Sequence, residues 1–173
     1  MISIISGKYK GRKLHQLKQL NIRPTQAKVR KSIFQILAPF EGLEILDLYA
    51  GVGTLGIEAL SRGAASVVFV EKNRRASKIL YKNLELISST NTQIILSDAL
   101  QYVKYINKPS FDIVFADPPY SNIDYNDYLN KIARILKPGG VFCMEMKKQN
   151  IDTSDVRIEY YGNTQVVLWN EKR

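Results

Sequence analysis

The chain has 173 residues, of which 45% are apolar, and it contains one cysteine and one histidine. This length suits a single α/β domain, and the apolar runs are too short to span a membrane, so we expect a soluble cytoplasmic protein. Because Cys143 has no partner for a disulfide and His15 is far from it in sequence, we expect neither a disulfide nor a Cys/His metal centre.

The net charge of +9 is concentrated at the amino-terminal end. The first forty residues carry nine Lys and Arg and no acid, whereas the remaining residues carry sixteen charges of each sign. Since this asymmetry is typical of a nucleic-acid-binding arm, we divide the chain into a basic extension, residues 1–40, and a neutral domain, residues 41–173. The candidates for contact with nucleic acid are Lys8, Lys10, Arg12, Lys13, Arg23, Lys28 and Arg30. A solvated basic tail or contact with an anionic membrane is the alternative interpretation.

A hairpin and a helix open the predicted fold. Residues 2–15 combine a short apolar run with the turn-prone Gly7 and Gly11, which predicts two short strands. The dipeptide Pro24-Thr25 precedes an amphipathic stretch, so we expect a helix over residues 26–37.

From Glu44 onward, apolar strands alternate with amphipathic helices. Strands are expected at residues 45–49, 67–71, 94–96, 111–116 and 141–146, and helices at residues 55–60, 74–87, 99–106 and 125–136. The last two segments, VRIEYYG and TQVVLWN, are joined through Gly162-Asn163 without a helix, which predicts an antiparallel hairpin. The pattern predicts an α/β, Rossmann-like fold with a mostly parallel seven-stranded sheet and an antiparallel C-terminal strand.

A glycine-rich turn follows the first strand of this alternation. Gly51, Gly53 and Gly56 form a GxGxxG pattern, and Glu71 lies twenty residues beyond Gly51. Glycines at a tight strand-to-helix turn let a nucleoside-like ligand lie against the backbone. The pattern fits a nicotinamide dinucleotide as well as S-adenosylmethionine, so it does not identify the ligand alone.

The charges beside this turn favour S-adenosylmethionine. Carboxylates are expected at the carboxyl ends of four neighbouring strands, where they would repel a pyrophosphate and attract a sulfonium. We assign Glu71 to the ribose hydroxyls, Asp98 with Ala99 to the adenine end, and Asp47 to the methionine end. The predicted cofactor site comprises Asp47, Tyr49, Gly51, Gly53, Glu71, Lys72, Asp98, Ala99 and Asp117. The alternative is that such acids are helix caps, above all Asp98.

The candidate catalytic segment is Asp117-Pro118-Pro119-Tyr120, which follows the strand FDIVFA. Two prolines fix the backbone and remove its donors, so the Asp117 carboxylate and the Pro118 carbonyl can act as rigid acceptors. Acceptors suit the exocyclic amine of a base, whose hydrogens must be held while the nitrogen is aligned with a methyl donor. Tyr120 is expected to stack on the base. A Pro-Pro turn with an incidental tyrosine is the structural alternative.

Together these segments resemble the bacterial 16S ribosomal RNA guanine-N2 methyltransferases of the RsmD type over nearly the whole chain. The likeness rests on the segments SGKYKGRKL, IRPTQAKVRKSIF, LDLYAGVGTLGIEALSRGA, VFVEKN, FDIVFADPPY, LKPGG and YGNT. It implies the class I S-adenosylmethionine-dependent methyltransferase fold, no metal, and a guanine, nucleotide 966 of 16S rRNA, held by the DPPY segment. It also implies that Arg23 and Thr25 lie near the cofactor. Lys31 and Tyr49 depart from the family pattern, which usually has an acid and a phenylalanine there.

The resemblance further implies that the substrate is 16S rRNA within the 30S subunit or an assembly intermediate, and we expect a monomer that contacts no membrane. Two other functions stay open. A DPPY segment also serves adenine-N6 and cytosine-N4 methyltransferases that act on DNA, although this chain is short for a separate DNA-reading domain. A non-catalytic RNA-binding assembly factor that keeps the cofactor fold is the second.

Overall fold

The computed structural model of the chain describes residues 2–17, 27–88, 91–119 and 124–172. Seven strands form one sheet in the order β5-β4-β3-β6-β7-β9-β8, and two short strands, β1 and β2, form a separate hairpin. The strands are β1 (Ile2–Ser3), β2 (Lys13–Leu14), β3 (Glu44–Leu48), β4 (Ser66–Val70), β5 (Thr92–Ile95), β6 (Phe111–Ala116), β7 (Leu136–Lys147), β8 (Val156–Tyr161) and β9 (Thr164–Asn170). The helices are α1 (Ala27–Ile36), α2 (Thr54–Ser61), α3 (Arg74–Ile87), α4 (Ala99–Lys104) and α5 (Tyr125–Ala133).

The predicted sheet is confirmed. Strands β5, β4, β3, β6 and β7 pair in parallel, and β9 runs antiparallel between β7 and β8. The C-terminal hairpin turns at residues 162–163, as its Gly-Asn pair predicts. The long β7·β9 pairing, from Val141 with Asn170 to Lys147 with Thr164, joins the hairpin firmly to the parallel strands.

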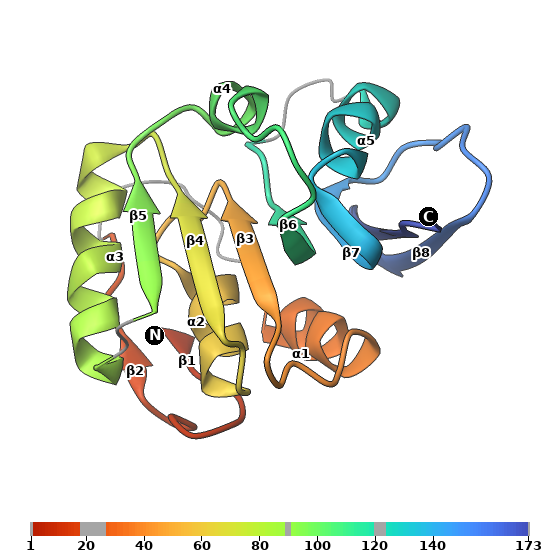
Figure 1. Cartoon of the computed structure of the whole chain (residues 1–173). Helices are drawn as coiled ribbons and strands as arrows, with labels where there is room; N and C mark the ends of the chain where they lie inside the picture. Colours follow the sequence, from red (N-terminus) through yellow and green to blue (C-terminus); the bar gives the residue numbers. More distant parts are fainter. Residues whose placement is uncertain (1, 18–26, 89–90, 120–123, 173) are drawn as a thin grey trace.

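Helices cover both faces of the sheet, so the core has two halves. Side chains of consecutive strand residues point to opposite faces, and in β3 Ile45 belongs to one buried cluster while Leu46 belongs to the other. The first cluster contains apolar residues of α1, α2 and α3, and the second contains residues of α4 and α5. In Figure 1, α4 and α5 lie at the top of the view, whereas α1 and α2 lie at the bottom and α3 lies at the left.

Several element boundaries differ from the prediction. Helix α5 ends at Ala133 rather than at Leu136, because Leu136 already pairs with Phe111 as the first residue of β7. The segment between Leu136 and Val141 contains Pro138 and two glycines and belongs to β7. Beside it, the register of the β6–β7 pairing shifts between Phe111 and Ile113. A proline at an irregular strand position costs no ladder hydrogen bond, which explains why it is tolerated there. Helix α4 ends two residues earlier than expected.

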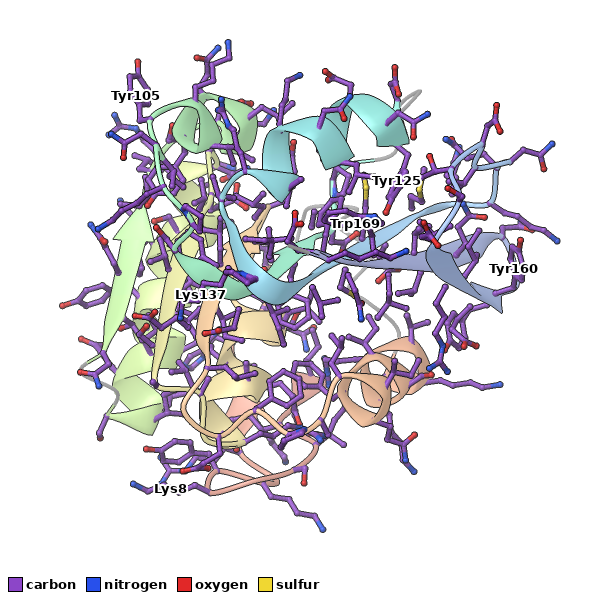
Figure 2. All side chains as sticks on the ribbon, turned by 45° about the vertical axis from the view of Figure 1, so that its right-hand side comes forward. Lys8, Tyr105, Tyr125, Lys137, Tyr160 and Trp169 are labelled. Carbon is purple, nitrogen blue, oxygen red and sulfur yellow. The ribbon has the colours of Figure 1, made fainter. Side chains whose placement is uncertain are left out.

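The β1–β2 hairpin packs onto the core at the end of the molecule opposite the carboxyl ends of the parallel strands (Figure 1). Figure 2 shows the separation, with Lys8 at one end and Tyr105, which follows α4, at the other. Ile4 and Leu14 of the hairpin are buried in the cluster that holds α1. The division at residue 40 therefore stays a prediction about function, because residues on both sides share one core. Within the described residues, no helix is long and apolar enough to cross a membrane.

Candidate functional site

The parallel strands end at one level, which brings the predicted site residues to one edge. Leu48, the last residue of β3, pairs with Val70 of β4 and Ala116 of β6, and Val70 pairs with Ile95 of β5. The residues that follow these strand ends include Tyr49, Glu71 and Asp117, so the three lie side by side along the edge. This edge is where open α/β sheets bind ligands.

The glycine turn adopts a backbone that few other residues could take. Gly51 has φ of 57° and Gly53 has φ of 88°, both in the left-handed region that favours glycine. A Cβ on Gly53 would lie 2.3 Å from Leu80 Cδ1, so the turn is packed directly against α3. A Cβ on Gly51 would meet only the Tyr49 carbonyl oxygen, at 4.0 Å, so the turn is packed at Gly53 and open at Gly51.

Glu71 holds this turn in place. Its Oε2 accepts a hydrogen bond from the Gly51 N–H at 2.8 Å, and its Oε1 accepts one from the Asn73 N–H at 2.6 Å. The side chain of Asn73 in turn caps α3 by accepting from the Arg75 and Ala76 amides. Both oxygens of Glu71 retain lone pairs for a ligand. Its assignment to ribose hydroxyls stays a prediction.

Asp47 is a buried carboxylate at the edge whose pKa is raised. It is 2% exposed, and its Oδ2 accepts the Gly56 N–H at 2.8 Å. Burial, aided by the nearby negative charge of Glu71, raises the pKa of Asp47 to about 7, although the bond from Gly56 works in the opposite direction. A negative charge at Asp47 is therefore costly until a cation approaches.

Tyr49 links β3 to α5. Its hydroxyl lies 2.6 Å from the Tyr128 hydroxyl, and the two ring centroids are 6.5 Å apart. Burial, the bond to Tyr128 and the charge of Asp98 together raise the pKa of Tyr49. Asp98 therefore lies near Tyr49, as expected for members of one site. Tyr128 was not predicted, although its spacing of three residues from Tyr125 and four from Ile132 puts it on the apolar face of α5.

Asp98 caps α4, as the structural alternative proposed. Its Oδ1 accepts hydrogen bonds from the Leu100 and Gln101 amides, both at 3.1 Å. The adjacent Ala99 is buried, whereas Lys72 beside Glu71 is exposed. The cap accounts for one carboxylate oxygen, and contact with an adenine stays a prediction.

The DPPY segment leaves β6 at the same edge. Asp117 is half-buried, Pro118 is buried and Pro119 is exposed, so the backbone passes from the core to the surface within three residues. Tyr120 lies outside the described residues, as do Arg23 and Thr25. The structure thus brings Asp117 to the level of Tyr49 and Glu71, as the strand assignments predict.

One candidate nucleic-acid contact needs correction. Arg30 is 3% exposed, its Nη2 donates to the Ser3 carbonyl at 2.8 Å, and burial lowers its pKa while Glu58 opposes that effect. It joins α1 to the hairpin instead of facing a ligand, because its position on α1 is part of the buried face. The remaining described candidates are exposed, namely Lys8, Lys10, Arg12, Lys13 and Lys28. Arg12 also donates to the Leu86 carbonyl.

Two structural residues were missed from sequence. Glu58 is 1% exposed and accepts the Ile5 amide at 2.7 Å and the Ser6 amide at 3.0 Å, which anchors the hairpin. Asn83 is fully buried on α3, and its amide donates to the Val52 carbonyl of the glycine turn at 2.9 Å. A polar residue on the apolar face of an amphipathic helix is a readable signal, and Asn83 occupies such a position.

The comparisons with known proteins agree with this geometry. Residues 2–170 match the protein family described as "Conserved hypothetical protein 95". The chain is 41% identical over 123 residues to "Ribosomal RNA small subunit methyltransferase D" of Haemophilus influenzae, covering 69% of this chain and 64% of that protein. It is 34% identical over 154 residues to the protein of that name from Buchnera aphidicola, covering 87% and 81% respectively. The chain thus spans less than two thirds of the Haemophilus protein.

A solved structure shows the same fold. "Putative methyltransferase yhhF from Escherichia coli" superposes with a TM-score of 0.88 at 31% identity, and the match covers 99% of this chain and 98% of that one. Together with the strand order β5-β4-β3-β6-β7-β9-β8, this likeness confirms the predicted Rossmann-like, class I methyltransferase fold.

Proposed function

The chain belongs to the family described as "Conserved hypothetical protein 95", and we propose that it is, like its relatives named ribosomal RNA small subunit methyltransferase D, an S-adenosylmethionine-dependent methyltransferase of 16S ribosomal RNA. The proposed acceptor is the N2 amine of a guanine, nucleotide 966, in the 30S subunit or an assembly intermediate. The observation that carries the proposal is the acidic edge, where Asp47 and Glu71 bond to the glycine turn and the helix after it, and Asp117 follows the strand next to that of Asp47.

The residues of the edge fit S-adenosylmethionine better than a dinucleotide. The pKa of Asp47 is raised mainly by burial and further by repulsion from the charge of Glu71, so the added negative charge of a pyrophosphate would be disfavoured. A ligand that carries a sulfonium and an ammonium would relieve that repulsion. When bound, S-adenosylmethionine supplies an electrophilic methyl group. Glu71 would orient the ribose, Asp98 with Ala99 the adenine, and Asp47 with Gly51 and Gly53 the methionine end.

Asp117 and the Pro118 carbonyl would hold the target amine. An exocyclic guanine nitrogen is a weak nucleophile because its lone pair is delocalised into the ring, so the two acceptors hold its hydrogens and align its lone pair. Positioning of this kind contributes up to about 7–11 kcal/mol in favourable cases. The proton is lost after the nitrogen gains the methyl group, and Asp117 would accept it. Tyr120 would stack on the base.

The exposed lysines of the hairpin would bind RNA phosphates. Lys8, Lys10 and Lys13 are exposed around the hairpin, and none of them is ion-paired with another described residue. Unpaired cations on a rigid hairpin provide the salt-dependent attraction that nucleic-acid binding requires.

The test offers the purified protein radiolabelled S-adenosylmethionine and three acceptors, namely undermethylated 30S subunits, free 16S rRNA and duplex DNA. We expect label in N2-methylguanosine, with subunits or free RNA as the acceptor. Label confined to adenine or cytosine of DNA would overturn the substrate but keep the cofactor. Absence of label, together with absence of cofactor binding in calorimetry, would favour a non-catalytic RNA-binding protein.

A further inference from the structure

The hairpin and the candidate site lie at opposite ends of the sheet, and helix α3 spans the distance between them (Figure 1). At its first residues, α3 is tied to the site, because Asn73, its N-cap, donates its amide to Glu71. At its last residues it is tied to the hairpin, because Arg12 donates to the Leu86 carbonyl. With fourteen residues, α3 is about 20 Å long at 1.5 Å per residue.

The exposed face of α3 is strongly basic. Its exposed cations are Arg74, Arg75, Lys78 and Lys82, and its one acid is Glu85. Arg75, Lys78 and Lys82 follow one another at spacings of three and four residues, so they form one stripe along the helix. Among the described residues, none of these cations forms an ion pair.

The hairpin and α3 form one rigid surface. The backbone N–H of His15 donates to Asn83 Oδ1 at 2.8 Å, and Asn83 Nδ2 donates to the His15 carbonyl at 3.2 Å. Asn83 is fully buried, so these bonds fix the strand that leaves the hairpin to a side chain anchored in the core beside α3. Arg12, which donates to the Leu86 carbonyl, brings one cation of the hairpin to the last turn of α3, four residues from Lys82.

An exposed tyrosine stands at the edge of the basic stripe. Tyr81 is 61% exposed, and with Lys78 it lines a groove of about 570 Å³ between α3 and β5. Leu84, Ile94 and Leu96 add apolar wall to this groove. A cation beside an exposed aromatic ring is the combination that holds single-stranded nucleic acid, through phosphate contact and base stacking.

We infer that the exposed face of α3, with Arg75, Lys78 and Lys82 as phosphate contacts and Tyr81 as a stacking ring, is a second RNA-binding surface that continues the hairpin toward the methyltransferase site. The inference rests on the proposed function for the identity of the partner. It explains how a hairpin at the far end of the molecule can act on the same RNA as Asp117. An unpaired strand is favoured over a membrane, because a lipid surface would not require a stacking ring beside a groove.

The test removes three charges from α3 and three from a matched control surface. The variant Arg75→Gln/Lys78→Gln/Lys82→Gln keeps helix-forming side chains of similar length. The control Lys148→Gln/Arg157→Gln/Lys172→Gln changes net charge equally, beside β8 at the other edge of the sheet from β5. Binding of a short fluorescent single-stranded RNA is measured over a range of salt concentrations, and cofactor binding is measured by calorimetry for both proteins.

Affinity decreases as the salt concentration rises, and the slope of log affinity against log salt measures how steeply. We expect this slope to become less steep by roughly two for the α3 variant, since each lost phosphate contact removes about 0.7. The control slope should stay that of the wild type, and cofactor affinity should be unchanged in both variants. Equal slopes for the two variants would overturn the inference. Loss of binding to phosphatidylserine vesicles without loss of RNA binding would also overturn it and assign the surface to a membrane.

A second pair of variants tests the stacking ring. Tyr81→Ala should weaken RNA binding roughly fivefold or more at constant salt slope, by loss of base stacking. Tyr160→Ala is the matched control, because Tyr160 is 57% exposed and lies beside Lys148 on the other edge. Equal affinities of the two would remove Tyr81 from the inference. The proposed function can fail while this inference holds. In that case the wild-type protein would bind this RNA through α3 but would transfer no methyl group to guanine.

Discussion

The acidic edge of the sheet and the basic surface of the hairpin and α3 use charge in opposite ways. At the edge, Asp47 and Glu71 are 2% and 9% exposed, and each accepts a backbone amide near the glycine turn. On α3, Lys78 and Lys82 are exposed and form no ion pair with any described residue. Buried charges act at short range on a ligand held in one orientation, whereas exposed charges attract a polyanion at long range.

This difference predicts where substitutions will matter for chemistry and where they will matter for binding. Changes at the edge should alter turnover, cofactor affinity or the pH dependence of stability. Changes at the hairpin and α3 should alter RNA affinity and its salt dependence, or the attachment of the hairpin itself.

The largest effect is expected at Asp117. Asp117→Asn keeps the size of the side chain but replaces a charged acceptor with an amide, so the guanine amine is held less well and loses its proton acceptor. We expect turnover to fall by roughly 10²–10³-fold, the loss typical of one aligned electrostatic contact. Single-turnover methylation measures it, and calorimetry should show cofactor affinity within about threefold of wild type. Unchanged turnover would remove Asp117 from the chemistry.

The next effect concerns the attachment of the hairpin. Glu58→Ala leaves the Ile5 and Ser6 amides without their acceptor and removes the ion pair with Arg62, whose Nε lies 2.8 Å from Glu58 Oε1. We expect the free energy of unfolding to fall by about 3–5 kcal/mol, because a buried carboxylate with three donors is lost. Urea denaturation measures this change.

Glu44→Ala is the control for that variant. Glu44 is half exposed and pairs with Lys137 at 2.6 Å, so its removal should cost less than about 1 kcal/mol. Equal destabilisation by the two substitutions would show that the hairpin is not held by Glu58.

The third effect is a pH dependence of the free energy of unfolding that arises from the buried Asp47. Its pKa is raised from 3.8 to about 7, so the folded protein binds this proton more tightly than the unfolded chain does. The resulting stabilisation is complete below the unfolded pKa and is lost as pH rises toward the folded pKa. Between about pH 5 and pH 7 it amounts to about 2 kcal/mol, at 1.36 kcal/mol per unit.

Asp47→Asn removes this titration and can still accept the Gly56 amide. Urea denaturation at the two pH values should therefore show a smaller loss of stability in the variant than in the wild type. A second readout is proton release on binding S-adenosylmethionine, since a nearby cation lowers the pKa of Asp47. Identical pH dependence in both proteins would mean that Asp47 is ionised throughout this range.

The sequence predicted the order of the elements and the acids at the sheet edge, but not the basic stripe on α3. Alternating apolar strands and the glycine turn placed Asp47, Glu71 and Asp117 correctly because strand ends of a parallel sheet share one edge. A count of charges along the chain described residues 41–173 as neutral. In the folded chain the cations of α3 lie on its exposed face, and which side chains of a helix are exposed depends on how that helix packs.

Arg30 and Tyr128 show the same limit at single residues. A lysine or arginine in a basic segment is exposed by default, yet Arg30 falls on the buried face of α1 and satisfies the Ser3 carbonyl. Tyr128 reaches Tyr49 across 79 residues of sequence, and a contact of that separation depends on how α5 packs against the sheet. Local patterns contain no information on such partners.

The smallest effect is expected for the tyrosine pair at the edge. Tyr49→Phe removes a hydroxyl that lies 2.6 Å from the Tyr128 hydroxyl, and the ring can keep its place. We expect a loss of about 0.5–1.5 kcal/mol in the free energy of unfolding, the usual net value of one hydrogen bond. Tyr128→Phe should cost a similar amount, and the double variant should cost little more than either single one, because both remove the same bond. Additive losses would show that the two hydroxyls act independently, with partners other than each other, and that β3 and α5 are joined at this edge by ring packing alone.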